Sequence, residues 1–192
     1  MRIDDFDWTM TRLLPQDART TFKELGDAVG HTGLGAKKRV AKLLEHGVLQ
    51  LTALVNTEAL GFGLAMILLE MGSAAAMRKT IERYRDCPRI INFFTTLGGY
   101  NLIALVMAED QGTLENEAMD QCGLRSGEGI RRSEVYAIGT LSQASFLPLC
   151  LSTLNVVGDV TPCGVECQSC PSFQVQKCVG CPSTSCCKGP LG

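Results

Sequence analysis

The chain has 192 residues, of which 45% are hydrophobic and 20% are charged, with 18 Lys and Arg against 20 Asp and Glu. This composition excludes a disordered, collagen-like or low-complexity protein and is typical of one or two compact domains. The first residues are acidic, and no uninterrupted apolar run approaches the roughly 20 residues that a bilayer demands, so we expect a cytoplasmic protein with no membrane partner. Because the net charge is only −2, nucleic-acid binding would require a local concentration of positive charge.

Three short helices are predicted near the amino end, at about residues 3–14, 20–29 and 32–46. Aspartates suit the start of the first helix, and glycines suit the ends of the second and third. Three short helices joined by tight turns are typical of a helix-turn-helix domain. The apolar positions expected to face its core from the second and third helices are Phe22, Leu25, Val29, Leu34, Val40, Leu43 and Leu44.

Positive charge is concentrated on the third of these helices. Its four cations, set against the single carboxylate of Glu45, are Lys37, Lys38, Arg39 and Lys42. Charge runs are usually solvated helix faces, but a recognition helix needs such a cluster, because neutralised phosphates and released counterions supply most of the affinity for DNA. We therefore expect these four side chains to contact double-stranded DNA, with Thr32 donating to a phosphate at the start of the helix.

A second domain is predicted after a connecting strand at residues 48–55. The expected order is a strand at 64–71, a helix at 73–84, strands at 89–96 and 100–108, a helix at 112–121 and a strand at 133–138. This is a split βαββαβ plan, in which both helices cover one face of the sheet. The other face then needs cover, so we expect a homodimer or a higher oligomer. Residues 142–160 are ambiguous between a further strand and a linker.

The predicted fold class is therefore α+β with three parts. Residues 1–56 form the helix-turn-helix domain with its connecting strand, residues 57–150 form a ferredoxin-like βαββαβ domain, and residues 151–192 form a linker and a small cysteine-rich tail.

The tail holds seven of the ten cysteines: Cys163, Cys167, Cys170, Cys178, Cys181, Cys186 and Cys187. A segment with so few apolar side chains cannot offset its chain entropy by burial, so order there requires a metal or a covalent link. We expect the first five thiolates to converge on a metal centre. The adjacent pair at 186 and 187 has poor geometry for an internal disulfide, and serves as a ligand or a redox-exchange site instead.

Two kinds of centre fit the spacing. A [4Fe-4S] cluster would take Cys163, Cys167 and Cys170 together with Cys178 or Cys181. A zinc ion would take Cys167, Cys170, Cys178 and Cys181 as two Cys-x-x-Cys pairs, which leaves Cys163 unused. The cluster is our expectation, and zinc is the alternative, together with free or disulfide-bonded thiols. The three remaining cysteines, Cys87, Cys122 and Cys150, are expected to be small buried hydrophobic residues.

Several short motifs become specific when they are taken together. They are Ile3-Asp4, Asp7, Asp17, Arg19, Glu24-Leu25, Val29-Gly30, Thr32, Arg39-Val40, Leu43, Gly47-Val48-Leu49 and Leu60-Gly61. In this set the chain resembles the Lrp/AsnC, or feast/famine, transcription regulators over about residues 3–140. The resemblance implies that the second domain is a ligand-binding RAM domain that dimerises through its sheet. It also implies a small-molecule effector site at Gly98, Gly99, Tyr100 and Asn101, where the family commonly has an aspartate in place of the asparagine.

The sequence thus predicts a sequence-specific DNA-binding transcription regulator, not an enzyme, whose tail senses redox state, oxygen or metal. One alternative is an enzyme that resembles siroheme decarboxylases, which share the two-domain plan. Against it, both histidines, His31 and His46, lie in the helix-turn-helix segment, so the second domain has no imidazole for acid chemistry or axial ligation. The other alternative is an architectural DNA-binding protein with a structural zinc tail.

Overall fold

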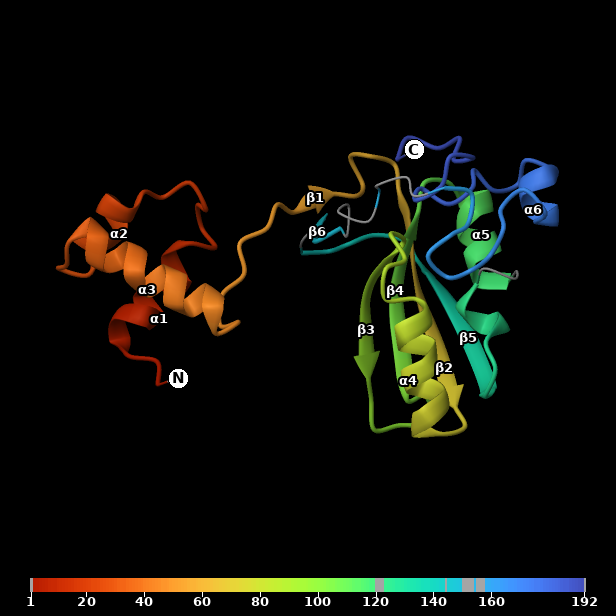
Figure 1. Cartoon of the computed structure of the whole chain (residues 1–192), viewed down its shortest axis with the longest axis horizontal. Coiled ribbons are helices and arrows are strands. Elements are labelled where there is room, and N and C mark those ends of the chain that lie inside the picture. Colours follow the sequence, from red (N-terminus) through yellow and green to blue (C-terminus); the bar gives the residue numbers. More distant parts are fainter. Residues whose placement is uncertain (1, 120–122, 144, 150–153, 155–157, 192) are drawn as a thin grey trace. The chain divides into compact units, whose positions relative to one another are not determined.

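The chain divides into two compact units, Met1–Ala53 and Leu54–Gly192 (Figure 1). The computed structural model describes residues 2–119, 123–143, 145–149, 154 and 158–191. The described part of the cysteine-rich tail belongs to the second unit. None of the helices in these described ranges has the length and apolar character needed to cross a membrane.

The first unit contains the three predicted helices: α1 (Asp5–Leu13), α2 (Phe22–Ala28) and α3 (Gly33–Glu45). Each begins behind a side chain that caps its free N–H groups. Asp4 accepts from two backbone N–H groups of α1, Thr21 forms a reciprocal capping box with Glu24 of α2, and Thr32 accepts from an N–H group of α3. Local capping therefore accounts for the positions at which all three helices start.

The core of this unit corrects part of the predicted burial. Leu25, Val40 and Leu43 are buried as expected, but Phe22, Leu34 and Leu44 are 42%, 65% and 39% exposed. The inner face of α3 is set by Ala36, Val40 and Leu43. Since successive helical residues turn by about 100°, Leu34 points to the opposite face. The prediction assigned the inner face of α3 from its large apolar residues and overlooked Ala36, which is small but buried.

Two glycines shape the turn between α2 and α3. A Cβ atom on Gly26 would lie 2.7 Å from the backbone oxygen of His31, so the turn passes too close for any side chain there. Gly30 has a φ of +68°, a conformation that favours glycine. These residues set α3 against α2 and thereby fix which face of α3 reaches solvent.

The second unit is built on a four-stranded antiparallel sheet with the order β3-β4-β2-β5, which confirms the split βαββαβ plan. Its elements are β1 (Val55–Asn56), β2 (Gly63–Met71), α4 (Ala74–Arg83), β3 (Ile90–Thr95), β4 (Leu102–Ala108), α5 (Gln111–Met119), the 3-10 helix η1 (Leu124–Ser126), β5 (Ile130–Ile138), β6 (Phe146–Leu147) and α6 (Pro171–Gln174).

The predicted strand at residues 48–55 is largely wrong. Only Val55 and Asn56 are in a strand, and they pair with β6 in a separate two-stranded sheet. Leu51 and Leu54 are 47% and 52% exposed. An apolar run becomes a strand only where a partner strand lies beside it, and the partner here is just two residues long. The ambiguous segment at 142–160 contributes that partner, β6.

Both long helices pack on one face of the sheet, as predicted. Buried residues of β2 such as Ile67 and Leu69 form one core with Tyr84 after α4 and Leu114 of α5. The opposite face is partly uncovered, because its apolar and aromatic side chains Met66, Phe94 and Tyr136 are 36%, 45% and 54% exposed. This open face is the surface on which the expected self-association depends.

Candidate functional site

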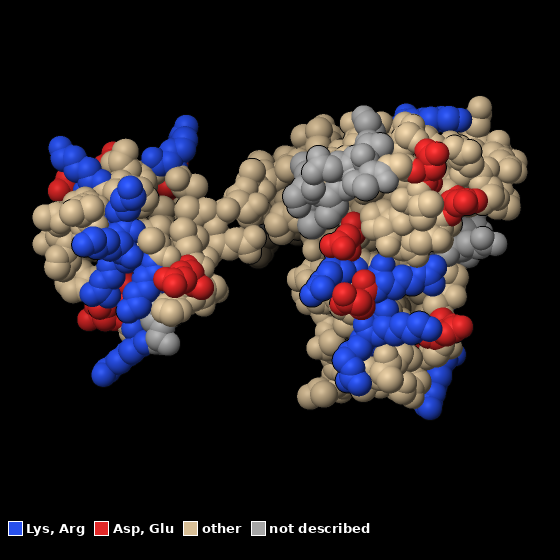
Figure 2. Space-filling view, in the orientation of Figure 1, with Lys and Arg blue, Asp and Glu red and all other residues tan. Residues whose placement is uncertain are grey.

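The outer face of α3 carries the expected concentration of positive charge. Lys37, Lys38 and Lys42 are exposed to solvent, and Lys and Arg side chains gather on the visible face of the first unit (Figure 2). Because Ala36, Val40 and Leu43 anchor the opposite side of α3, the lysines cannot turn inward without exposing the core. The helix thus presents three exposed cations on an anchored backbone, which suits contact with a polyanion.

Arg39 differs from the three lysines because it is only partly exposed and is paired with carboxylates of the same unit. Its Nη1 atom forms an ion pair with the carboxylate of Asp4 and lies 3.3 Å from Asp7, whose side chain is fully buried. Hydrogen bonding and charge from Asp4 raise the pKa of Arg39 although partial burial opposes this. The expected DNA contact by Arg39 stays a prediction, and it would compete with these two carboxylates.

Thr32 is placed at the first turn of α3, as the DNA-contact prediction requires. Its Oγ1 accepts a hydrogen bond from the backbone N–H of Gly35 at 3.2 Å. A hydroxyl that accepts in this way still has its own proton to donate. Thr32 can therefore cap the helix and donate to a phosphate at the same time.

The predicted effector turn between β3 and β4 is held by Asn101. The Asn101 side chain accepts from the Met71 N–H at 2.7 Å and donates to the Met71 carbonyl at 3.0 Å. This two-way pairing needs an amide, because a carboxylate has no proton to donate at neutral pH. Gly98 and Gly99 are exposed. The Cζ atom of Arg132 lies over the Tyr100 ring, 4.4 Å from the ring centroid. The structure thus gives the Asn101 amide a structural role that the sequence did not predict.

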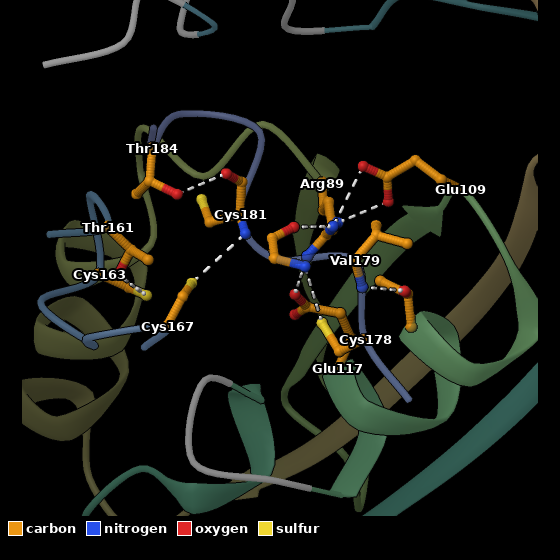
Figure 3. A network of polar contacts seen from close by, with 12 residues as sticks. Arg89, Glu109, Glu117, Thr161, Cys163, Cys167, Cys178, Val179, Cys181 and Thr184 are labelled. Atoms are coloured by element: carbon orange, nitrogen blue, oxygen red, sulfur yellow. Dashed lines mark hydrogen bonds and ion pairs between the residues drawn. The ribbon is translucent and has the colours of Figure 1, made fainter. Parts of the chain in front are cut away.

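A buried ion-pair network joins the tail to the sheet. Arg89, just before β3, binds both carboxylate oxygens of Glu109 at 2.9 and 3.1 Å and one oxygen of Glu117 on α5 at 3.1 Å. The same guanidinium, drawn with Glu109 and Glu117 in Figure 3, also donates to the backbone carbonyl of Gly180 in the tail. Only 3% of the Arg89 side chain is exposed. The tail is therefore attached to the interior of the domain.

The charges of this network depend on one another. Burial opposes the charged form of Arg89, but Glu117 and Glu109 outweigh burial and raise the pKa of Arg89. Burial raises the pKa of Glu117, and Arg89 acts against that rise. Without the guanidinium, the carboxylate of Glu117 would be a buried charge with no compensating cation, which is costly.

The five cysteines predicted as metal ligands are brought together. They line one cavity of about 30 Å³ with a sixth cysteine from the connection between α4 and β3: Cys87, Cys163, Cys167, Cys170, Cys178 and Cys181. The sulfurs receive backbone N–H groups, from Gly180 to Cys178 and from Cys181 to Cys167, each at 3.4 Å. Such N–H groups stabilise metal-bound thiolates.

Without a bound metal, burial keeps the Cys167 and Cys181 thiols neutral at physiological pH. Burial raises the pKa of Cys167 to about 12 and that of Cys181 to about 11. A cation that binds must displace these protons, so affinity will depend on pH. Within the described ranges no three His, Cys, Asp or Glu side chains already have the arrangement of a metal site. The donor set suits a thiophilic metal, and its side chains have to turn toward the common cavity to bind one.

Sequence reasoning missed several residues of this site. Cys87 stands alone in the sequence, and Arg89, Glu109 and Glu117 belong to no motif. Their roles arise from contacts between segments that are 20 to 91 positions apart. The sequence offers no signal for such pairings.

Comparison with known proteins places the chain among transcriptional regulators. No protein-family model matches the chain. The HTH-type transcriptional regulator Rv2324 of Mycobacterium tuberculosis is 30% identical over 135 residues, which are 69% of this chain and 89% of that protein. Because the match covers 89% of Rv2324 but only 69% of this chain, Rv2324 is the shorter of the two.

Solved structures share the fold. AsnC of E. coli has a TM-score of 0.64 and 20% identity, and the match covers 75% of this chain and 97% of AsnC. The leucine response regulatory protein LrpA of Mycobacterium tuberculosis has a TM-score of 0.65 and 22% identity, with 74% and 97% covered. At these identities the two structures support the fold alone.

Proposed function

The chain belongs to the Lrp/AsnC family of HTH-type transcriptional regulators, and we propose that it acts by placing α3 of each protomer in the major groove of double-stranded DNA. The observation that carries this proposal is the outward face of α3, where Lys37, Lys38 and Lys42 are exposed on a helix anchored by the core. The relatives named above are transcriptional regulators, which supports a role that is not enzymatic.

The lysines and Arg39 have different roles in this proposal. Lys37, Lys38 and Lys42 neutralise phosphates, whereas Arg39 holds α3 against the start of α1 through Asp4 and Asp7. The exposed side chain of Leu34, at the start of the same outer face, is free to approach base edges.

DNA binding is tested with a duplex selected from a random library, by fluorescence anisotropy at several salt concentrations. Replacing Lys38 with alanine is expected to weaken binding and to lower the slope of log K against log salt by about 0.9 for each phosphate contact removed. Lys79 on α4, paired with Glu128 at 2.9 Å, provides a charge-matched control whose replacement leaves the slope unchanged. An unaltered slope in the three lysine variants of α3 would refute the proposed interface.

Self-association through the open sheet face sets the distance between the two recognition helices. Met66, Phe94 and Tyr136 supply the apolar and aromatic surface that a second copy would cover. Replacing Met66 with glutamate is expected to shift the sedimentation coefficient from dimer to monomer and to abolish binding to two half-sites.

A cytoplasmic location fits this function. An effector at the turn before β4 would contact the exposed backbone of Gly98 and Gly99, since the Asn101 amide is already used by Met71.

The second proposed function concerns the tail, which binds a metal through cysteine thiolates and thereby regulates the protein. The supporting observation is that all five cysteines of the tail motif line one cavity. Both a zinc ion and a [4Fe-4S] cluster are held by four cysteine thiolates, and we propose the zinc ion as the occupant of this cavity.

Metal analysis of anaerobically purified protein separates these alternatives. One zinc per chain and a colourless protein support the zinc site, whereas stoichiometric iron and broad absorbance near 400 nm support the cluster. Regulation is tested by measuring DNA affinity with and without a chelator, in the full chain and in a chain that ends at Val160. An effect of the chelator only in the full chain supports sensing by the tail.

A further inference from the structure

Cys87 lies far from the tail in sequence but next to it in space. It belongs to the connection between α4 and β3, and it lines the same cavity as the five tail cysteines. Cys87 and Cys163 both pack against the core of the sheet domain. The carbonyl of Cys163 also accepts from Arg83 Nε at 3.1 Å, which ties this part of the tail to the domain that carries Cys87.

Four of the six thiols are linked to one another through Cys181. Cys87 interacts electrostatically with Cys163 and Cys181, and Cys181 also interacts with Cys163. Cys167 accepts the backbone N–H of Cys181. A tetrahedral thiolate site requires four sulfurs around one point, and Cys181 with its three thiol neighbours in the cavity supplies four. Cys167 also interacts with the thiol of Cys186, which does not line the cavity.

Cys178 is oriented differently. Its sulfur accepts hydrogen bonds from the Gly180 N–H and the Thr113 hydroxyl, and it interacts with Arg89. These partners belong to the ion-pair network at the base of the tail (Figure 3). Cys178 is thus in contact with this network, whereas the thiol neighbours of Cys181 described above are Cys87, Cys163 and Cys167.

We propose that Cys87 is a metal ligand and that, with Cys163, Cys167 and Cys181, it holds one zinc ion between the sheet domain and the tail. This inference rests on the proposed metal binding by the tail and assigns its ligands. Zn²⁺ replaces the four thiol protons, which leave to solvent, and the resulting Zn(S-Cys)₄ centre carries a charge of −2. The guanidinium of Arg89, which interacts with Cys181, offsets part of that charge. A ligand on the sheet domain makes docking of the tail depend on the metal.

Cobalt substitution tests this assignment, because the sulfur-to-cobalt charge-transfer band reports the number of bound thiolates. In the full chain, Cys87→Ser is expected to lower the band per bound cobalt by roughly a quarter, one of four tetrahedral ligands. Zinc affinity is expected to fall more than about 100-fold, beyond the 10-fold to 100-fold effect of losing an outer partner. Cys187→Ser, in the same tail but outside the cavity, is the control and keeps the wild-type spectrum.

A second measurement needs no substitution and so does not depend on variant folding. Zinc is expected to protect Cys87, Cys163, Cys167 and Cys181 of the wild-type chain from alkylation, as followed by mass spectrometry, and to leave Cys187 reactive. A wild-type spectrum in Cys87→Ser together with unprotected Cys87 would overturn the ligand assignment while metal binding by the tail stands. If the wild-type chain binds neither cobalt nor zinc, the proposed metal function fails and this inference fails with it.

Discussion

Replacing Arg89 with methionine is expected to destabilise the second unit strongly. Methionine keeps much of the volume of the arginine stem but removes the guanidinium. The side chains of Glu109 and Glu117, 1% and 11% exposed, then remain buried without their cation. The carbonyl of Gly180 loses its hydrogen bond from the same group. One substitution therefore affects β4, α5 and the tail together.

The magnitude follows from the burial of the network. Removing one partner of a buried ion pair costs about 3–5 kcal/mol, because an uncompensated charge is left in a poorly solvated site. For a chain of this length, each kcal/mol lowers the melting temperature by about 2–4 °C. The expected decrease in the melting temperature of the second unit is therefore roughly 6–20 °C.

The effect of Arg89→Met should also depend on pH. Burial raises the pKa of Glu117, and Arg89 counteracts that rise, so the variant has a still higher folded-state pKa. A folded state that binds more protons than the unfolded state gains stability as pH falls. The deficit of the variant is therefore largest at neutral pH and shrinks toward about pH 5, where a carboxyl with a raised pKa becomes neutral.

Two spectroscopic signals separate the units in this experiment. Trp8, the single tryptophan of the chain, lies in the first unit, so its fluorescence follows that unit, whereas far-ultraviolet circular dichroism follows both. The variant should shift the circular dichroism transition and leave the Trp8 transition unchanged. Arg85→Met, which removes an exposed pair with Glu82 at 3.1 Å, is the control and should change stability by less than about 1 kcal/mol. A loss below about 1 kcal/mol in Arg89→Met would refute the argument from burial.

Three further predictions concern local contacts. Asn101→Asp removes the donor to the Met71 carbonyl and should cost about 1–3 kcal/mol in denaturant unfolding, whereas an unchanged midpoint would exclude the two-way pairing. The pKa of Asp4 lies below its ordinary value because its carboxylate accepts the backbone N–H of Asp7 and pairs with the guanidinium of Arg39. Asp4 therefore stabilises the first unit at pH values above its unfolded pKa, and this contribution to stability disappears in acid. Asp4→Asn should thus lower the Trp8 unfolding midpoint at pH 7 but not at about pH 2, and equal losses at both would contradict this. Gly112→Ala would place a Cβ 2.6 Å from the Lys177 carbonyl, so it should speed proteolysis of the tail, although the same change usually stabilises a helix by about 0.5–1 kcal/mol.

Much of the fold was predictable because its signals are local. The caps at Asp4, Thr21 and Thr32 are single side chains that bond to N–H groups two or three positions away. The strands of the main sheet are long apolar runs, and such runs predict buried strands. The prediction of a connecting strand at residues 48–55 was largely wrong, because strand formation there depends on a partner strand about 90 positions later in the chain. No local sequence pattern carries that information.

The candidate site was predictable only in part, for the same reason. The tail cysteines form a motif, and their gathering follows from short turns such as the one at Gly164, where φ is +81°. The surface against which they pack does not follow from the motif. Cys87 and Arg89 reach the cavity because β3 begins there, and that position is a property of the whole sheet.

The helix-turn-helix unit illustrates why residue lists from sequence need a structure to assign roles. Asp4, Asp7 and Arg39 enter the sequence comparison as three separate points of resemblance, and Arg39 was counted with the lysines as a DNA contact. In the structure the three form one ion-pair network that fixes α3 against α1. The carboxylate of Asp7 is fully buried, so withdrawing Arg39 to bind a phosphate would leave a buried charge poorly compensated. The free energy of that loss opposes a DNA contact for which Arg39 would leave these carboxylates, so we expect the exposed lysines to neutralise most of the phosphates.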